Sequence, residues 1–331
     1  MTEHPTFLVT TPLPEPGMQM LRGAGTVDVP DATLDRDGLA HACASGRYDV
    51  VVSQLRDRFD ADLLAHARIR GVANYAVGYD NIDVDAATAH AIMVGNTPGV
   101  LTDATADVAM LLILATARRA VEADAYVRAG RFDGWKPELL LGQDVSGRVL
   151  GLAGFGRIAR ATARRALGFG MTVLFAPRPP ADRPVTDAEL GEFAGRVEHV
   201  QWDELVRRSD FLSLHIPLTD DTHHLVDAGT FRAMQPTSIL INTARGPIVD
   251  ETALVTALAD GEIAGAGLDV YEDEPALAPG LAERPNAVLL PHVGSATVRV
   301  RSEMARLCAA NAIEMAAGRR PPHPVNPDAW Q

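Results

Sequence analysis

A glycine-rich turn in Val149–Arg160, VLGLAGFGRIAR, constrains the fold more than any other part of the sequence. An apolar run leads into Gly154 and Gly156, and small, apolar and basic residues follow at helical spacing. This pattern is typical of a strand, a tight turn and a helix N-terminus, whose unpaired N–H groups suit a pyrophosphate. Gly154 permits the turn, Gly156 lets phosphates approach the backbone, and Ala159 replaces the third glycine of the fingerprint. The sequence therefore predicts a dinucleotide-binding unit.

Length and charge limit the possible functions. A chain of 331 residues, 47% of them hydrophobic, suggests an α/β protein of about two domains. The net charge of −13 argues against a nucleic-acid partner, because phosphate backbones need clustered lysine and arginine. The longest apolar run, Ala109–Ala117, falls short of the ~20 residues that span a bilayer. Cys43 and Cys308 lie far apart, which favours reduced thiols, and we expect a cytoplasmic protein with no membrane partner.

Short apolar segments alternate with segments of helical periodicity along the chain. Before residue 96 the candidate strands are Thr6–Thr10, Thr26–Val29, Asp49–Ser53, Gly71–Tyr75 and Ile92–Val94. After the glycine turn they are Met171–Ala176, Asp210–Pro217, Ser238–Asn242, Ile263–Leu268 and Val288–Leu290. Strands separated by helices predict parallel βαβ units and therefore an α/β fold. Segment 6–95 forms a domain of its own, and Asn96–Gly99 marks its boundary.

The segment between the two groups of strands predicts one long helix from about Thr102 to Gly130. It is richer in apolar residues than a surface helix, so it lies between domains, packs on a partner subunit, or is simply buried. A loop-rich segment, Phe132–Gly147, follows and carries Trp135. The final helix is expected over about Ala296–Ala317, and the proline-rich tail after it is expected to pack back onto the first domain.

The residues after the second strand of the dinucleotide unit bear on the choice of cofactor. NAD-preferring proteins usually carry Asp or Glu there, which binds the ribose 2′-hydroxyl. In this chain Pro177 and Arg178 occupy the position, so a guanidinium is available for a 2′-phosphate. This favours NADP, with NAD as a further possibility. The alternative is that Arg178 is a solvated loop charge.

Polar residues follow several apolar strands after the glycine turn. His215, Arg245, Asp269 and His292 come at four strand ends, which places them at the carboxyl edge of the predicted sheet. Glu274 follows shortly after Asp269 and precedes Pro275. Reduction of a 2-oxo acid needs a guanidinium for the carboxylate, an acid for the oxo oxygen and a carboxylate that favours the imidazolium. Arg245, His292 and Glu274 meet these needs.

Each of these residues also has a structural interpretation. His292 could be a satisfied strand-end histidine, Glu274 part of a solvated acidic loop, and Arg245 a helix cap or a partner of Asp250. His215 is a rival proton donor, although its neighbours suggest a packed strand end. The pair His223–His224 lacks further ligands at metal spacing, so no metal is predicted.

A glycine loop, Ala76–Asp80, follows a strand of the first domain directly. Open α/β sheets bind ligands at the carboxyl ends of their strands, so this loop is a candidate binding loop. The equal alternative is an ordinary turn, with Asp83 capping the next helix.

Several longer motifs identify a family. They are VGYDNIDVDAAT, GNTPGVLTDATAD, GFGRIA, INTARGPIVD, GAGLDVYEDEP and LLPHVGSAT, spread over nearly the whole chain. The chain resembles the D-isomer-specific 2-hydroxyacid dehydrogenases, most of all the glyoxylate/hydroxypyruvate reductase branch. The resemblance implies two Rossmann-like, doubly wound parallel-sheet domains with a cleft between them. The substrate domain would comprise residues 1–100 and 298–331, and the dinucleotide-binding domain residues 101–297.

The resemblance also implies roles for individual residues. Arg245 would bind substrate, His292 would donate the proton, and Glu274 would support His292. Val77 and Gly78 match the loop whose amides bind the substrate carboxylate. The residues expected to contact the cofactor are Gly154, Phe155, Gly156, Arg157, Ile158, Arg178, Ile216, Pro217, Thr243, Ala244, Arg245, Asp269, His292 and Gly294. The long helix and the loop around Trp135 resemble dimerisation elements, with Trp135 reaching the substrate pocket of the other subunit of a homodimer.

The predicted activity is NAD(P)H-dependent reduction of a small 2-oxo acid, glyoxylate or hydroxypyruvate, to the D-2-hydroxy acid. Larger substrates, such as 2-ketogluconate or phenylpyruvates, are an alternative. A non-catalytic nucleotide-sensing scaffold is a further one, although no basic patch or peptide-binding extension supports it.

Overall fold

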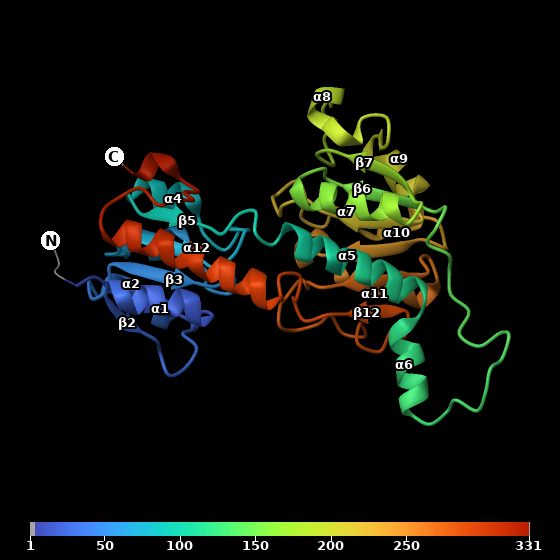
Figure 1. The fold of residues 1–331 in the computed structure, drawn as a ribbon, viewed down its shortest axis with the longest axis horizontal. Coiled ribbons are helices and arrows are strands. Elements are labelled where there is room, and N and C mark those ends of the chain that lie inside the picture. The colour runs from blue at the N-terminus through green and yellow to red at the C-terminus, as the bar shows by residue number, and fades with distance from the viewer. Residues whose placement is uncertain (1–3, 331) are drawn as a thin grey trace. The chain divides into compact units, whose positions relative to one another are not determined.

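The computed structural model describes residues 4–330, and the chain divides into two compact units. Unit 1 comprises Met1–Leu101 and Ala296–Gln331, and unit 2 comprises Thr102–Ser295. Each unit contains one parallel sheet with helices on both faces (Figure 1). The predicted α/β class with two parallel-sheet domains is therefore confirmed.

The sheet of unit 1 has five strands in the order β2-β1-β3-β4-β5. The strands are β1 (Thr6–Val9), β2 (Thr26–Asp28), β3 (Val50–Ser53), β4 (Gly71–Asn74) and β5 (Met93–Gly95). The helices are α1 (Glu15–Ala24), α2 (Arg36–Ala44), α3 (Ala61–His66), α4 (Val84–Ala89) and α12 (Val298–Ala316). Helices α1 and α12 pack together, and α12 also packs on β3 and β4 (Figure 1). The C-terminal tail returns to β5, where the Val325 N–H donates to the Val94 carbonyl over 2.8 Å, as predicted.

The sheet of unit 2 has seven strands in the order β12-β11-β10-β9-β6-β7-β8. They are β6 (Val149–Ala153), β7 (Thr172–Ala176), β8 (Glu198–His199), β9 (Phe211–Leu214), β10 (Ile239–Asn242), β11 (Gly265–Leu268) and β12 (Ala287–Leu289). The helices are α5 (Thr102–Ala117), α6 (Ala120–Arg128), α7 (Arg157–Gly168), α8 (Asp187–Leu190), α9 (Trp202–Arg208), α10 (Ala228–Ala233) and α11 (Glu251–Asp260).

Alternation along the strands divides the core of unit 2 into two layers. Ile239 and Ile241 of β10 join a cluster that includes α5 and α7, whereas Leu240 joins the cluster on the opposite face with α9, α10 and α11. Successive side chains of a strand point to opposite faces, so a strand that is apolar throughout can fill both layers. The polar groups that follow the strands are thereby left at the carboxyl edge.

Aspartate side chains begin many of the helices. The carboxylates of Asp35, Asp60, Asp83, Asp227 and Asp250 each accept the backbone N–H three residues later. This satisfies one of the unpaired donors of the first turn. The interpretation of Asp83 as a helix cap is therefore confirmed.

The predicted single helix from Thr102 to Gly130 is wrong. Helix α5 ends at Ala117, Arg119 takes the left-handed conformation with φ +51°, and α6 begins at Ala120. A left-handed residue stops an α-helix, and the Arg119 guanidinium holds this break by bonding Glu122 and the Leu141 carbonyl. Helix α5 is packed against β10, β11 and α7, whereas α6 has no buried residue and stands out from unit 2 (Figure 1).

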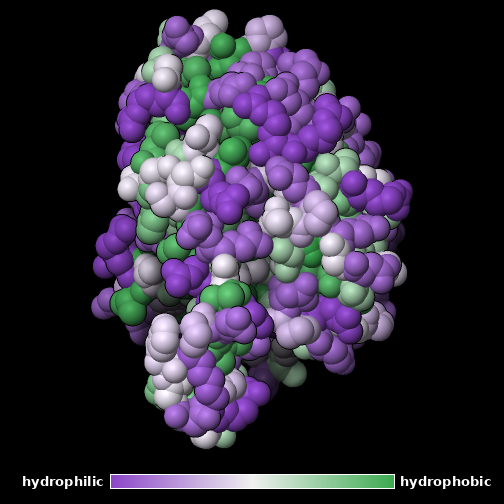
Figure 2. Space-filling view, turned by 90° about the vertical axis from the view of Figure 1, so that its right-hand side faces the viewer, coloured by the Kyte–Doolittle hydropathy of each residue, from purple (hydrophilic) through white to green (hydrophobic). Residues whose placement is uncertain are grey.

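Hydrophilic residues cover much of the face of unit 2 that Figure 2 shows, with smaller hydrophobic areas between them. None of the helices formed by residues 4–330 combines the length and apolarity that a membrane crossing requires.

Close helix packing in unit 1 generates a stability prediction. A Cβ on Gly17 of α1 would lie 2.7 Å from the Ala305 carbonyl oxygen of α12, whereas one on Gly23 of the same helix meets no atom within 4 Å. Overpacking a tight contact costs about 1–3 kcal/mol, so Gly17→Ala should lower the free energy of unfolding by that amount in urea titrations. Gly23→Ala should be neutral or stabilising by up to about 1 kcal/mol. Equal effects of the two substitutions would contradict the packing assigned to α1 and α12.

Candidate active site

The carboxyl edge of the seven-stranded sheet gathers most of the predicted site residues of unit 2. Gly154 follows β6, Thr243–Arg245 follow β10, Asp269 follows β11, and His292 comes three residues after β12. Because parallel strands end at the same edge, segments far apart in the sequence meet there.

The glycine turn after β6 has the geometry that the sequence predicts. Gly154 has φ +91°, and a Cβ there would lie 2.6 Å from the His215 carbonyl oxygen, so only glycine fits. Gly156 is exposed and open on its Cβ side, and it precedes α7 without a side-chain cap. Ala159 is fully buried against the core. The start of α7 therefore has no side-chain cap and no Cβ at Gly156 in the way of a ligand, which suits a pyrophosphate.

The side chains beside this turn and after β7 have different surroundings. The Phe155 ring stacks on Phe175 with centroids 4.2 Å apart, and the Arg160 guanidinium carbon lies 4.6 Å from the Phe155 ring centroid, so this buried ring is packed within its own unit. Arg157 is exposed at the start of α7, and Ile158 is half-buried. Arg178 is exposed in the loop after β7, where the nearby Asp182 carboxylate is bound to His199 and Gln201.

The loop after β10 presents Thr243 and Arg245. The Thr243 hydroxyl is buried and has no hydrogen-bond partner within residues 4–330, which fits a ligand that supplies one. The buried Asn242 amide fixes the loop by donating to the Arg245 carbonyl and accepting the Ala244 N–H. A Cβ on Gly246 would lie 1.9 Å from the Tyr271 backbone, so this loop packs directly on the segment that carries Glu274.

Glu274 and His292 form the central pair of the site. His292 Nδ1 lies 2.9 Å from Glu274 Oε2, and the other oxygen, Oε1, accepts the Tyr271 N–H over 3.1 Å. Burial acts to raise the pKa of Glu274, but the His292 hydrogen bond and charge, the Tyr271 N–H and the Arg245 charge together lower it. Glu274 is therefore an anion at neutral pH, oriented toward the imidazole ring.

Asp269 holds the backbone on which His292 sits. Its two carboxylate oxygens accept the N–H groups of Val293 and Gly294, each over 2.7 Å, and the residue is 1% exposed. His292 has φ +53°, a left-handed conformation that non-glycine residues rarely adopt. Burial raises the pKa of Asp269, against the pull of these two hydrogen bonds. The resemblance implies a cofactor contact for Asp269 and gives no sign of this supporting role, because the two N–H groups that it binds lie 24 and 25 residues further along the chain.

His215 is poorly suited to the rival role of proton donor. Its Nε2 lies 2.9 Å from the Ser213 hydroxyl, and burial lowers the pKa of His215 to about 4. It is neutral at physiological pH. The adjacent Ile216 is buried beneath the glycine turn, and Pro217 is exposed.

Val77 and Gly78 lie in unit 1, at the carboxyl end of β4. Their carbonyl oxygens accept the side-chain amides of Asn96, over 2.7 Å, and Asn74, over 2.9 Å. A trans peptide points its N–H opposite to its carbonyl, so the N–H groups of Gly78 and Tyr79 face away from these asparagines. Neither N–H donates a hydrogen bond within the described part of the chain, which leaves both available to an anionic group.

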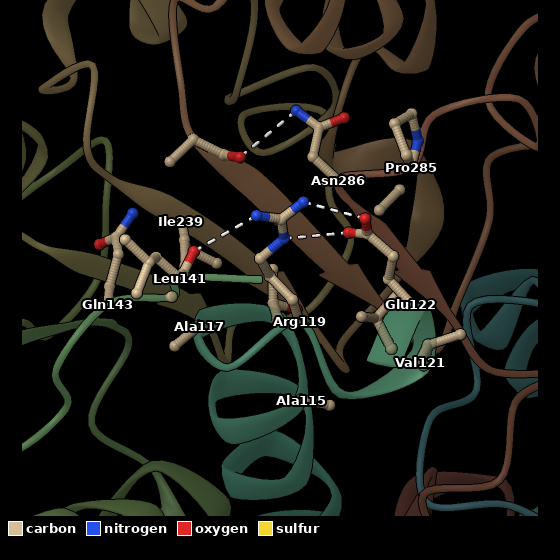
Figure 3. A pocket seen from close by; sticks show the side chains of 15 residues that line it. Ala115, Ala117, Arg119, Val121, Glu122, Leu141, Gln143, Ile239, Pro285 and Asn286 are labelled. Carbon is tan, nitrogen blue, oxygen red and sulfur yellow. Dashed lines mark hydrogen bonds and ion pairs between the residues drawn. The ribbon is translucent and has the colours of Figure 1, made fainter. Parts of the chain in front are cut away.

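Trp135 and a surface pocket of unit 2 lie apart from the residues at the carboxyl edge of its sheet. Trp135 is 84% exposed in the loop after α6, and its indole makes no ring contact or hydrogen bond within residues 4–330. The pocket in Figure 3 is formed by the end of α5, the start of α6, the loop at Leu141–Gln143, and residues such as Ile239 and Ala287. Ile239 and Ala287 begin their strands, so the pocket lies at the amino edge, opposite the predicted site.

Comparison with known proteins adds a family and relatives. Residues 110–294 match the model of the D-isomer specific 2-hydroxyacid dehydrogenase NAD binding domain. The chain is 44% identical to a glyoxylate reductase of Thermococcus litoralis over 98% of its length and 97% of the relative, and 46% identical to that of Thermococcus onnurineus over 97% and 96%. An NADPH-dependent glyoxylate/hydroxypyruvate reductase of Sinorhizobium meliloti, solved with NADP and malonate, has a TM-score of 0.84 at 32% identity, covering 99% of both chains.

The lowered pKa of Glu274 generates a pH prediction. A carboxylate whose pKa is depressed from 4.5 on folding adds stability that is present above that value and is lost as the pH falls through the folded pKa. The free energy of unfolding of wild type minus that of Glu274→Gln, measured in urea, should therefore shrink as the pH falls from about 4.5 toward 3. A difference that does not shrink over this acid range would contradict the lowered pKa of Glu274.

Proposed function

Because this chain belongs to the family of D-isomer-specific 2-hydroxyacid dehydrogenases, we propose that it reduces glyoxylate or hydroxypyruvate to the 2-hydroxy acid with NADPH. The observation that carries the proposal is the Glu274–His292 pair, 2.9 Å apart, at the sheet edge that also carries Arg245 and the glycine turn. The glyoxylate reductases at 44% and 46% identity support the small substrate.

The residues fit a dinucleotide along this edge. The open N-terminus of α7, from Gly154 to Ile158, would hold the pyrophosphate, and the unpartnered Thr243 hydroxyl would find an acceptor or donor on the cofactor. Ile216, Pro217, Ala244, Asp269 and Gly294 would complete the site. The nicotinamide supplies a hydride to the oxo carbon when it is bound.

The chain supplies binding and a proton. The planar guanidinium of Arg245 would bind the substrate carboxylate through two N–H groups. A substrate contact by the amides of the Val77–Gly78 loop in unit 1 stays a prediction. Because Nδ1 of His292 faces Glu274, Nε2 is the nitrogen left to donate a proton to the oxo oxygen. The Glu274 carboxylate stabilises positive charge on the ring and fixes its orientation. One hydride and one proton then convert the oxo group to a hydroxyl.

The preference for NADP rests on Arg178. Its guanidinium is exposed directly after β7, where the carboxylate of NAD-preferring proteins would stand, and a charge-assisted bond to a 2′-phosphate would favour NADP. The Sinorhizobium meliloti reductase solved with NADP supports this preference.

Exposed apolar residues around α6 support a homodimer. Val121, Val127, Phe132, Trp135 and Leu141 are each more than half exposed on α6 and the loop that follows it. A helix with no buried residue gains little stability from packing on its own unit. A second copy would cover these side chains and bring Trp135 to the partner's substrate.

A cytoplasmic location stays a prediction.

Replacing the proton donor tests the reaction. His292→Ala should lower kcat for glyoxylate reduction by about 10²–10⁴-fold with little change in KM for NADPH, measured by NADPH absorbance. His199→Ala is the matched control, because it breaks another histidine–carboxylate pair of the same unit, His199–Asp182 at 2.7 Å. Equal kcat values for wild type and His292→Ala would remove His292 from the mechanism.

Replacing the cation after β7 tests the cofactor. A hydrogen bond to a charged group contributes about 1.5–3 kcal/mol, so Arg178→Ala should raise KM for NADPH about tenfold or more and leave KM for NADH unchanged. The control is Arg183→Ala, five residues along the loop, whose guanidinium is bound to Glu189. Parallel changes in both constants for Arg178→Ala would defeat the NADP assignment.

A further inference from the structure

A second cluster of potential ligand groups lies in unit 2, outside the proposed active site. His223 and His224 are consecutive in a turn, and Glu272 lies in the loop after β11. His224 Nε2 is 2.5 Å from Glu272 Oε1, and one ligand atom of each residue lies within 4.8 Å of the other two. We propose that His223, His224 and Glu272 form a binding site for a transition-metal ion of the zinc type.

The backbone brings both imidazoles to one side of the turn. Consecutive side chains of an extended strand point to opposite faces, so neighbouring histidines do not normally converge. His224 has φ +50°, and the two rings stack with centroids 4.1 Å apart. The His224 N–H donates to the Pro247 carbonyl over 2.9 Å, which fixes this conformation on the segment that follows Arg245.

Glu272 is oriented by contacts on its far side. Its Oε2 accepts the Glu251 N–H over 3.3 Å, and its own N–H donates to Glu251 Oε1 over 2.9 Å. These bonds leave Oε1 directed at His224. Outer contacts of this kind hold ligand carboxylates in place at metal sites.

The spacing and the ligand types fit zinc. Bonds of about 2.0–2.1 Å in a tetrahedron place ligand atoms about 3.3–3.4 Å apart. In the empty cluster, His224 Nε2 and Glu272 Oε1 are 2.5 Å apart, and the three ligand atoms all lie within 4.8 Å of one another, so small side-chain movements reach this spacing. His223 is exposed, so its ring can turn inward, and water can fill the fourth position. Two imidazoles with one carboxylate favour zinc, cobalt or nickel over magnesium and calcium, which prefer oxygen ligands.

The sequence alone predicts no metal here, because the histidine pair has no third ligand nearby in the chain. Glu272 lies 48 residues after His224 and reaches it only through the fold. Metal binding would replace the His224–Glu272 hydrogen bond.

Zinc titration of the chelator-treated, full-length protein tests the site independently of any enzyme activity. We expect isothermal titration calorimetry to give one zinc ion per chain, with a higher Tm in its presence. His223→Ala and Glu272→Gln should each weaken the affinity at least tenfold. His199→Ala, which disrupts a histidine–carboxylate pair with no third ligand in the described chain, should bind zinc as wild type does.

Absence of zinc binding by the wild type would overturn the proposal. So would equal zinc affinities of wild type and both ligand variants, because the ion would then be held elsewhere. Magnesium binding as tight as that of zinc would also overturn it, since that result indicates an acidic surface without imidazole ligation.

Discussion

The two hydrogen bonds from the Val293 and Gly294 N–H groups to Asp269 are the constraint on which the candidate site depends. These hydrogen bonds offset the free-energy cost of the left-handed backbone conformation at His292. The Asp269 carboxylate that accepts them is buried at the end of β11. Residues held in strained conformations persist only where their surroundings fix them. With the backbone fixed, the imidazole meets Glu274 at 2.9 Å, and its second nitrogen is left for chemistry.

The parallel sheet explains why the functional groups converge. Strands that are apolar throughout fill both core layers of unit 2, so the polar residues that follow them collect at one edge. Gly246 then lets the Arg245 loop pack on the Tyr271 backbone, and the Arg245 charge contributes to the lowered pKa of Glu274. Cation, anion and imidazole are therefore coupled through backbone contacts as well as through their charges.

Much of this arrangement could be expected from the sequence, and the exceptions share a physical cause. The glycine turn, the strand ends and the Asp83 cap are local patterns, and Arg245, Glu274 and His292 each come within a few residues of the end of a predicted strand. The helix break at Arg119, the support of the His292 loop by Asp269 and the approach of Glu272 to His224 depend on contacts between distant segments. No local periodicity or spacing encodes such contacts, so they become visible only in the folded chain.

A crystal structure of the protein with NADP and oxalate, an unreactive two-carbon acid, would show whether Arg245, His292 and Glu274 act on one ligand. We expect one oxalate carboxylate to pair with the Arg245 guanidinium, His292 Nε2 to lie within hydrogen-bond distance of an oxygen of the other, and Glu274 to remain bound to Nδ1. Oxalate bound without contact to Arg245, or a His292 ring turned away from both Glu274 and the ligand, would contradict it.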